Sequence, residues 1–305
     1  MRNMFAKVLT ELVAKDEEAI LFYADIGNRL FNPLKEIDQN RAINAGIAEA
    51  NMTSMAAGVA KMGMKPFIYT ITPFLTARNF EQIKIDIAYQ NLPVIIVGTG
   101  SGMSYANLGP THHSFEDIAL IRALPNMNIV CPADEVELEV LMPQIYKLNQ
   151  PCYFRIGKKN EPINYETKPD LTFGKAHVIE TGSEITILST GTILPLAKQL
   201  QLELKKRGYT PELTSFHTVK PIDEIYLKYV STQFKHIITL EEHNIHGGFG
   251  SAVLEWCNEQ QASLQVHRFG LPNRFIDQVS SRASALDKAG LNLDTIMKSL
   301  EQRMR

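Results

Sequence analysis

The chain has 305 residues, of which 45% are hydrophobic and 21% charged, as expected of a soluble globular protein with about two domains. A formal net charge of −2 and the lack of any Lys/Arg-rich run argue against a nucleic-acid partner. No run of about 18 apolar residues occurs, so no membrane partner is expected.

The three cysteines, Cys131, Cys152 and Cys257, lie far apart in the sequence. Their spacing matches neither a metal site nor a disulfide framework, which favours a reducing compartment. The N-terminal segment carries charges at short intervals and lacks the apolar stretch of a signal peptide. We therefore expect a cytoplasmic protein.

In the first half of the chain, short apolar runs alternate with segments of helical period. Strands are predicted at 19–24, 66–72, 92–97, 128–131 and 152–155, and helices at 49–62, at 77–89 and before the last of these strands. Strands separated by helices are typical of βαβ units in a parallel sheet.

The pattern lapses into a polar, proline-containing stretch at 156–175 and then restarts. Strands are predicted at 185–189, 213–216 and 236–240, and helices at 193–207, 250–258 and 293–305. The predicted fold class is α/β, with two consecutive domains that each form a mainly parallel sheet flanked by helices. We expect a first domain at 1–165, a linker at 166–180 and a second domain at 181–305.

Three blocks in order resemble the transketolase family. Residues 41–60, RAINAGIAEANMTSMAAGVA, resemble its glutamate block and the small-residue helix that follows. Residues 108–134, LGPTHHSFEDIALIRALPNMNIVCPAD, resemble its Gly-Pro-Thr-His block, and residues 239–253, TLEEHNIHGGFGSAV, resemble its C-terminal-domain signature. The resemblance implies a pyrimidine-binding domain followed by a transketolase C-terminal domain.

The resemblance also implies the cofactor and the partner. Full-length transketolases hold thiamine diphosphate and Mg²⁺ through a domain with a Gly-Asp-Gly segment, and this sequence contains no such segment. A split enzyme is implied, in which an N-terminal transketolase subunit provides the diphosphate site and most of the Mg²⁺ coordination. Because the family places the cofactor between the two domain types, an α2β2 assembly acting on small sugars is expected.

Glu49 is the first candidate catalytic and cofactor-binding residue. By resemblance, its carboxyl would hydrogen-bond the pyrimidine ring nitrogen, which prepares the aminopyrimidine to accept a proton from the thiazolium. The alternative is an ordinary acidic residue in the first turn of a helix, stabilised by the helix dipole. Phe74 would stack on the pyrimidine, Ile71 would add an apolar wall, and Asp25, at the exit of the first strand, is a further cofactor-binding candidate.

His112 matches the family histidine that faces the substrate beside the thiazolium, and it is a candidate catalytic and substrate-binding residue. Arg155 aligns with an arginine that holds a sugar phosphate, although an interdomain salt bridge is equally compatible with its position. Arg78, on the helix after Phe74, is a third substrate candidate. No metal ligands are predicted, because the adjacent His113 has no companions at ligand spacing.

The chain departs from the family pattern at two positions. Sugar-phosphate transketolases carry a histidine where this chain has Gly100, and an acidic residue where it has Leu108. These differences suggest a modified donor or acceptor, such as a deoxy, branched or nucleotide-linked sugar.

The glycines at 98–102 and 247–250 miss the spacing of a dinucleotide loop. The triplet 241–243, Glu-Glu-His, is interpreted as structural, with His243 as an outside candidate.

The resulting functional prediction is a transferase that moves a two-carbon ketol unit from a ketose to an aldehyde. One alternative is a decarboxylating enzyme, similar either to deoxyxylulose-phosphate synthase or to the beta chain of a 2-oxo-acid dehydrogenase. Another is a non-catalytic paralogue that serves in binding or regulation.

Overall fold

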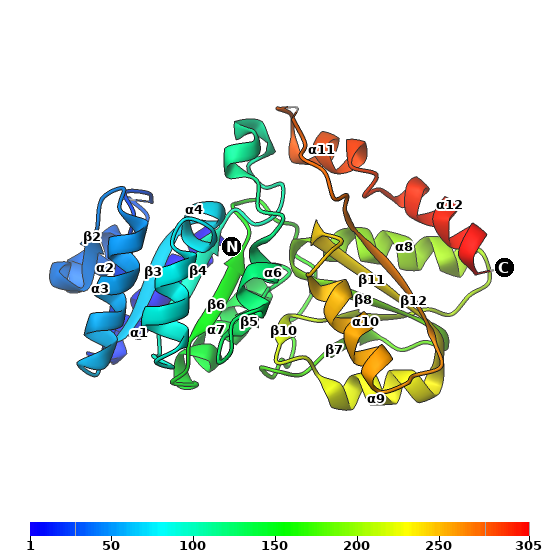
Figure 1. The fold of residues 1–305 in the computed structure, drawn as a ribbon, viewed down its shortest axis with the longest axis horizontal. Helices are drawn as coiled ribbons and strands as arrows, with labels where there is room; N and C mark the ends of the chain where they lie inside the picture. Colours follow the sequence, from blue (N-terminus) through cyan, green and yellow to red (C-terminus); the bar gives the residue numbers. More distant parts are fainter. Residues whose placement is uncertain (28, 278, 305) are drawn as a thin grey trace.

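The computed structural model describes residues 1–27, 29–277 and 279–304, and it consists of two α/β domains that lie side by side (Figure 1). The first half of the chain forms the domain on the left of that view and the second half forms the one on the right. Each domain is built around its own sheet. Within the described residues, no helix is both long and apolar enough to cross a membrane.

The first sheet has seven strands in the order β10-β5-β6-β4-β3-β1-β2. Their bounds are β1 Ala19–Tyr23, β2 Ala42–Asn44, β3 Lys65–Ile71, β4 Ile95–Thr99, β5 Asn128–Val130, β6 Cys152–Ile156 and β10 Thr218–Lys220. All neighbours pair in parallel except β10, which runs antiparallel to β5. The strands β1, β4 and β6 are buried along their whole length, which is why they consist mainly of apolar residues, with Arg155 in β6 and Thr99 in β4 as exceptions.

Helices cover both faces of this sheet. One face is packed by α1 (Arg2–Lys15), α2 (Asn32–Ile37) and α7 (Glu135–Lys147), and the other by α3 (Glu49–Lys61), the π-helical segment η2 (Ile83–Ala88) and α6 (Asp117–Arg122). The side chains on the two faces belong to separate hydrophobic clusters. This is the arrangement that a doubly covered parallel sheet requires.

The second sheet has five strands in the order β12-β11-β8-β9-β7. Its strands are β7 His177–Glu180, β8 Glu184–Thr190, β9 Glu212–Ser215, β11 Phe234–Asn244 and β12 Gln265–Leu271. Its helices are α8 Leu194–Lys206, α9 Glu224–Gln233, α10 Phe249–Glu259, α11 Arg282–Lys288 and α12 Leu293–Arg303. The edge strand β7 is antiparallel to β9, and the other neighbours pair in parallel.

The predicted fold class is confirmed, since two mainly parallel sheets flanked by helices follow one another in the chain. The predicted helix at 77–89 is wrong as one element. The chain instead forms α4 (Thr72–Thr76), α5 (Phe80–Gln82) and then η2. The break lies at Asn79, which leaves the helical region (φ −119°) and whose amide binds the Thr53 hydroxyl on α3. Arg305, the last residue of the predicted closing helix, lies outside the described residues.

The two sheets are not separated cleanly in the chain. Among the described residues, 157–176 contain no helix or strand, and β7 begins inside the stretch predicted as a linker. Strand β10 lies far along the second half but extends the first sheet, where Cys131 N–H also donates to the carbonyl of His217 (2.7 Å). The second half therefore supplies one edge of the first domain.

Candidate active site

Glu49 is the first residue of α3, and only 3% of its surface is exposed. Its carboxylate oxygen Oε2 accepts a hydrogen bond from Arg78 Nη1 (2.8 Å). Its backbone carbonyl accepts from the hydroxyl of Thr53 one turn later (2.9 Å). Burying a carboxylate costs desolvation free energy even when it is paired with a charged group. This argues against the alternative that Glu49 is an ordinary acidic residue in the first turn of a helix.

Phe74 lies on α4, directly after β3, and Ile71 is the residue that precedes this helix. The guanidinium carbon of Arg78 lies 4.4 Å from the centroid of the Phe74 ring. Arg78 therefore contacts both the carboxylate of Glu49 and the ring of Phe74, while about half of its own side chain stays exposed. The structure brings these three predicted residues into one group.

His112 continues this group from a different part of the chain. It ends the short 3-10 helix Pro110–His112, and its ring lies edge-on to Phe74 at a centroid distance of 5.1 Å. Burial lowers the pKa of His112, and the nearby Lys158 ammonium lowers it further. The imidazole is therefore neutral near pH 7, as a group that exchanges hydrogen bonds with sugar hydroxyls should be.

Tyr105 and Lys158 extend the group beyond His112, and the sequence did not indicate them. The Tyr105 ring lies 5.9 Å from His112, and Lys158 Nζ lies 4.1 Å from its centroid. Gly100 has φ +81°, and a Cβ there would lie 2.0 Å from the Tyr105 ring. The ring thus fills the space beside Gly100, where sugar-phosphate transketolases carry a histidine. The departure from the family pattern at Gly100 was the sequence feature that could have indicated Tyr105.

Asp25 lies at the exit of β1 in the left-handed region (φ 48°). Its backbone N–H donates to Asn44 Oδ1 (3.1 Å), and Asn44 Nδ2 donates back to the Asp25 carboxylate (2.9 Å). Asn44 also binds the N–H of Gly46 in the loop that leads to α3. Asp25 therefore braces the approach to Glu49, and direct contact with a cofactor stays a prediction.

Arg155 does not belong to this group, and its predicted role with a sugar phosphate needs correcting. The side chain is 2% exposed, and Nε donates to the Asp117 carboxylate at 2.5 Å. Nη2 donates to the carbonyls of Glu242 (2.9 Å) and Ser114 (3.3 Å). A guanidinium committed in this way cannot hold a substrate. Its salt bridge with Asp117 lies within the first domain, and it reaches the second domain only through the hydrogen bond to the Glu242 carbonyl, so the alternative of an interdomain salt bridge is not met either.

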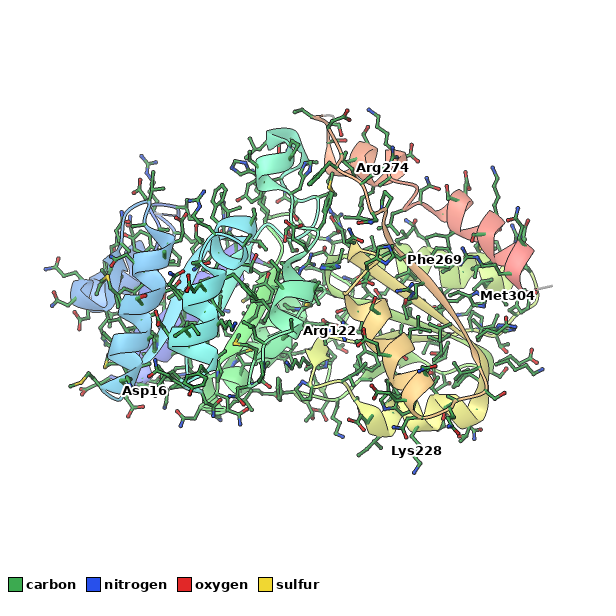
Figure 2. The ribbon with its side chains drawn as sticks, viewed as in Figure 1. Asp16, Arg122, Lys228, Phe269, Arg274 and Met304 are labelled. Carbon is green, nitrogen blue, oxygen red and sulfur yellow. The ribbon has the colours of Figure 1, made fainter. Side chains whose placement is uncertain are left out.

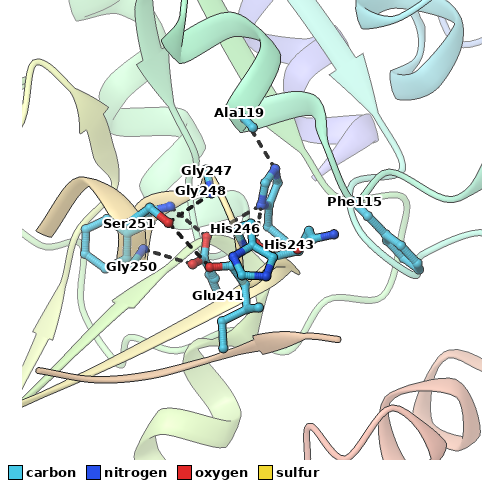
Figure 3. Close-up of polar contacts among 12 residues, drawn as sticks. Phe115, Ala119, Glu241, His243, His246, Gly247, Gly248, Gly250 and Ser251 are labelled. Carbon is cyan, nitrogen blue, oxygen red and sulfur yellow. Dashed lines mark hydrogen bonds and ion pairs between the residues drawn. The ribbon is translucent and has the colours of Figure 1, made fainter. Parts of the chain in front are cut away.

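The segment 241–243 is buried at the contact between the two domains (Figure 3). Glu241 accepts hydrogen bonds from the N–H groups of Phe249 (2.7 Å) and Gly250 (2.9 Å) at the start of α10, and burial raises its pKa to about 7. His243 Nε2 accepts from Ala119 N–H (3.3 Å) on α6. Burial lowers the pKa of His243 to about 4, so it is a neutral structural contact.

Arg122 makes a second contact between the domains, and Figure 2 labels it at their junction. Its Nη1 donates to the carbonyl of Gly247 (2.7 Å).

His113, the neighbour of His112, is buried and its ring stacks on Phe115 at 5.3 Å. Within residues 1–27, 29–277 and 279–304, no cluster of three His, Cys, Asp or Glu side chains could bind a metal ion.

Two family models match the chain. Residues 1–163 match "Transketolase, pyrimidine binding domain", and residues 174–296 match "Transketolase, C-terminal domain". The chain is 34% identical to a putative transketolase C-terminal section of Methanocaldococcus jannaschii, over 100% of this chain and 96% of that protein. It is 31% identical to an apulose-4-phosphate transketolase subunit of Phocaeicola vulgatus, over 95% of this chain and 94% of that protein.

Longer relatives and solved structures agree with these matches. A 1-deoxy-D-xylulose-5-phosphate synthase of Acidobacterium capsulatum is 33% identical over 98% of this chain, which spans 48% of that protein. A solved structure titled "Split gene transketolase, inactive beta4 tetramer" is 28% identical, with a TM-score of 0.87 over 99% of this chain and 96% of that one. The chain therefore belongs to the transketolase family, in which it is the counterpart of the C-terminal subunit of split transketolases.

Proposed function

We propose that this chain is the pyrimidine-binding subunit of a thiamine-diphosphate-dependent transketolase-like transferase, which moves a two-carbon ketol unit from a ketose to an aldehyde. The observation that carries the proposal is the continuous group formed by Glu49, Arg78, Phe74 and His112. It combines a buried carboxylate, which Arg78 joins to an aromatic ring, and a neutral imidazole in contact with that ring.

The group fits an aminopyrimidine. The ring nitrogen needs a carboxyl partner shielded from water, and Glu49 is 3% exposed. The ring face needs an aromatic surface, which Phe74 supplies beside the apolar Ile71. When bound, thiamine diphosphate would supply carbanion stabilisation at its thiazolium carbon.

The roles of this chain's own residues follow from that fit. Glu49 would hold a hydrogen bond to the pyrimidine nitrogen, and Phe74 would fix the plane of the ring. His112, kept neutral by its surroundings, would donate to and accept from hydroxyl and carbonyl oxygens of the sugar. Arg78 contacts both Glu49 and Phe74, so it would orient the carboxylate at the edge of the site.

We propose that a separate subunit supplies the diphosphate and Mg²⁺ site, giving an α2β2 enzyme. Relatives that align over 94–96% of their own length are named as subunits or as a C-terminal section. One of them, from Clostridium sp., is named 6-deoxy-6-sulfo-D-fructose transketolase subunit, and another is named for apulose 4-phosphate. These names support a modified sugar as substrate, in line with Gly100 and Leu108.

The three cysteines are free and buried, which is compatible with the cytoplasm.

A decarboxylating activity like that of 1-deoxy-D-xylulose-5-phosphate synthase is the second candidate. Relatives with that name are 32–34% identical over nearly the whole of this chain. The two reactions differ in their donor, because only the decarboxylating one releases CO₂ from pyruvate. Release of CO₂ by the reconstituted enzyme would favour the second candidate, and ketose-dependent transfer without CO₂ would favour the first.

The substitution Glu49→Gln tests the proposal. In the enzyme reconstituted with its partner subunit, we expect kcat to fall by roughly 10²–10⁴-fold, because a neutral amide cannot perform the proton-linked task of the carboxyl. The matched control is Glu81→Gln, which changes an exposed carboxylate on α5 and should leave kcat unchanged. Unchanged activity in Glu49→Gln would show that the proposed mechanism is wrong.

A further inference from the structure

The segment 100–114 connects β4 to the region before α6 and carries His112. Its first residues are buried although they form no helix or strand. Ser114 N–H donates to the carbonyl of Gly102 (3.0 Å), which closes the segment into a loop. Inside the loop, Ala106 N–H donates to the Met103 carbonyl (2.9 Å), and His112 N–H donates to the Gly109 carbonyl (3.0 Å). The position of His112 therefore depends on how the base of this loop is held.

The base of the loop is held by a carboxylate from the other domain. Glu242 lies on β11 of the second sheet, is 1% exposed, and accepts the backbone N–H of Met103 on Oε1 (2.7 Å). Gly102 passes so close that a Cβ there would lie 2.6 Å from Glu242 Cγ. Since Gly102 also has φ +59°, the glycine is what allows the loop to reach the carboxylate.

Glu242 itself is fixed from three directions. Arg282 on α11 donates to it with Nε (3.1 Å) and with Nη2, which binds Oε2. The hydroxyl of Thr192 donates to Oε2 (3.1 Å). The backbone carbonyl of Glu242 accepts from Arg155 Nη2 (2.9 Å), and the same nitrogen reaches the carbonyl of Ser114 at the other end of the loop.

These contacts give the carboxylate one defined orientation. A paired and hydrogen-bonded carboxylate in a buried position has little freedom, so its acceptor atom is a fixed point for the Met103 N–H. The remaining path to the site is short, because Tyr105, two residues after Met103, packs against the ring of His112 (5.9 Å). The second domain thus reaches the candidate active site through a backbone hydrogen bond.

We propose that Glu242 is a positioning residue, which holds the loop 100–114 from the C-terminal domain so that the ring of His112 faces Phe74. The functional part of this inference rests on the proposed transferase function. In this proposal the C-terminal domain contributes to the active site by positioning His112, and Glu242 does not itself contact the substrate.

Amide hydrogen exchange of the full-length chain tests the structural part. Glu242→Ala removes the acceptor and should raise the exchange of the amides in 100–114, whereas Glu242→Gln keeps an oxygen for the Met103 N–H and should restore much of the protection. Glu241→Ala is the matched control, since Glu241 is equally buried on the same strand but binds α10 instead of the loop. Equal exchange of the loop in Glu242→Ala and wild type would overturn the proposal, as would equal loosening in Glu241→Ala.

Kinetics of the enzyme reconstituted with its partner test the functional part. A displaced His112 should lower kcat by roughly ten- to a hundredfold in Glu242→Ala, with the affinity for thiamine diphosphate unchanged and partial rescue in Glu242→Gln. A loosened loop with unchanged kcat would overturn the positioning role.

If wild type bound no cofactor, the proposed function would fail, while the exchange result would still decide whether Glu242 holds the loop. Should Glu242→Ala not fold, Arg282→Gln frees the same carboxylate, and unchanged loop exchange in it would count against the proposal.

Discussion

The carboxylate of Glu49 and the imidazole of His112 lie at two ends of a short series of contacting side chains. Arg78 binds the carboxylate at 2.8 Å and covers the Phe74 ring at 4.4 Å, and the ring meets His112 at 5.1 Å. Each contact pairs groups of complementary character, a charge with a charge and a ring with a cation or a ring edge. These contacts therefore fix the positions of the four side chains relative to one another.

Substitution of Phe74 tests the aromatic surface at the scale of one side chain. Phe74→Leu keeps an apolar group of similar reach but loses the ring, so we expect the cofactor to bind about 2- to 10-fold more weakly, as a lost stacking interaction predicts. Phe74→Tyr retains the ring and is the matched control. The measurement is a calorimetric titration with thiamine diphosphate in the presence of the partner subunit. Identical affinities for Leu and Tyr variants would mean that Phe74 does not stack on the pyrimidine.

The sequence predicted the four residues of this series and missed two that extend it. Glu49 and His112 lie within blocks whose order along the chain is informative, and Phe74 and Arg78 follow the strand predicted at 66–72. Tyr105 and Lys158 are brought together by pairing of β4 with β6, and no local pattern marks that contact. Arg155 was a substrate candidate because it aligns with a family arginine that holds a sugar phosphate, and the sequence alone does not tell whether such an arginine is exposed or buried.

At the scale of elements, the site lies where parallel strands end. Glu49 begins α3, Phe74 lies on α4 directly after β3, and His112 lies in the loop that follows β4. The carboxyl ends of neighbouring parallel strands share one edge of a sheet, so residues distant in the sequence converge there. Most strands and long helices were predictable from apolar runs and period, but the break at Asn79 was not, because the residue makes a tertiary hydrogen bond to Thr53 that no local pattern marks.

The pair formed by Asp117 on α6 and Arg155 on β6 should be essential for stability. Burial alone would raise the pKa of Asp117, but Arg155 and His243 beside it lower the pKa overall, so the carboxylate stays charged. Asp117→Asn would leave a buried guanidinium without its counter-charge, and we expect a loss of about 3–5 kcal/mol in the free energy of unfolding. Urea denaturation measures this quantity.

The control for this prediction is an exposed pair on the second sheet. Glu184 and Lys235 are 2.9 Å apart with most of both side chains in solvent. Glu184→Gln should leave the denaturation midpoint nearly unchanged, because exposed ion pairs are screened. Similar midpoints for Asp117→Asn and Glu184→Gln would contradict the assignment of Arg155 to a structural pair.

At the scale of the whole molecule, the two domains are joined by buried polar contacts and a shared strand. Strand β10 comes from the second half of the chain and completes the first sheet. Glu242, His243 and Arg155 connect segments of the two domains across the junction. A sequence pattern with a lapse at 156–175 predicts two domains but carries no information about such crossings, because they join residues about a hundred positions apart.

Buried histidines predict how stability depends on pH. Burial lowers the pKa of His217 and of His243 to about 4, below the ordinary 6.5, so both take up a proton on unfolding between these values. Glu241, whose pKa burial raises from 4.5 to about 7, releases a proton on unfolding and opposes them. The pKa of His267 is lowered in the same way as those of the other two histidines, so three imidazoles take up a proton on unfolding, and each of them lowers the stability by ~1.4 kcal/mol per pH unit as the pH drops from roughly 6 to 5.

Urea denaturation at pH 5, 5.5 and 6 checks this slope. His217→Leu removes one of the three titrating imidazoles; its Nε2 has no hydrogen-bond partner, and its Nδ1 contacts only the neighbouring Thr218 hydroxyl, so an apolar side chain is tolerable there. The slope of the variant should be shallower than the slope of wild type by ~1.4 kcal/mol per pH unit. Equal slopes in the variant and in wild type would contradict the neutral, buried state of His217.

The most direct test of the proposed function is a titration with thiamine diphosphate and Mg²⁺, performed on this chain alone and on its mixture with the N-terminal transketolase subunit. We predict tight binding in the mixture only, because Glu49 and Phe74 supply the pyrimidine side while the partner supplies the diphosphate side. Tight binding by the chain alone would contradict the division of the cofactor site between two subunits. The absence of binding in the mixture would contradict the catalytic function itself and favour a non-catalytic subunit.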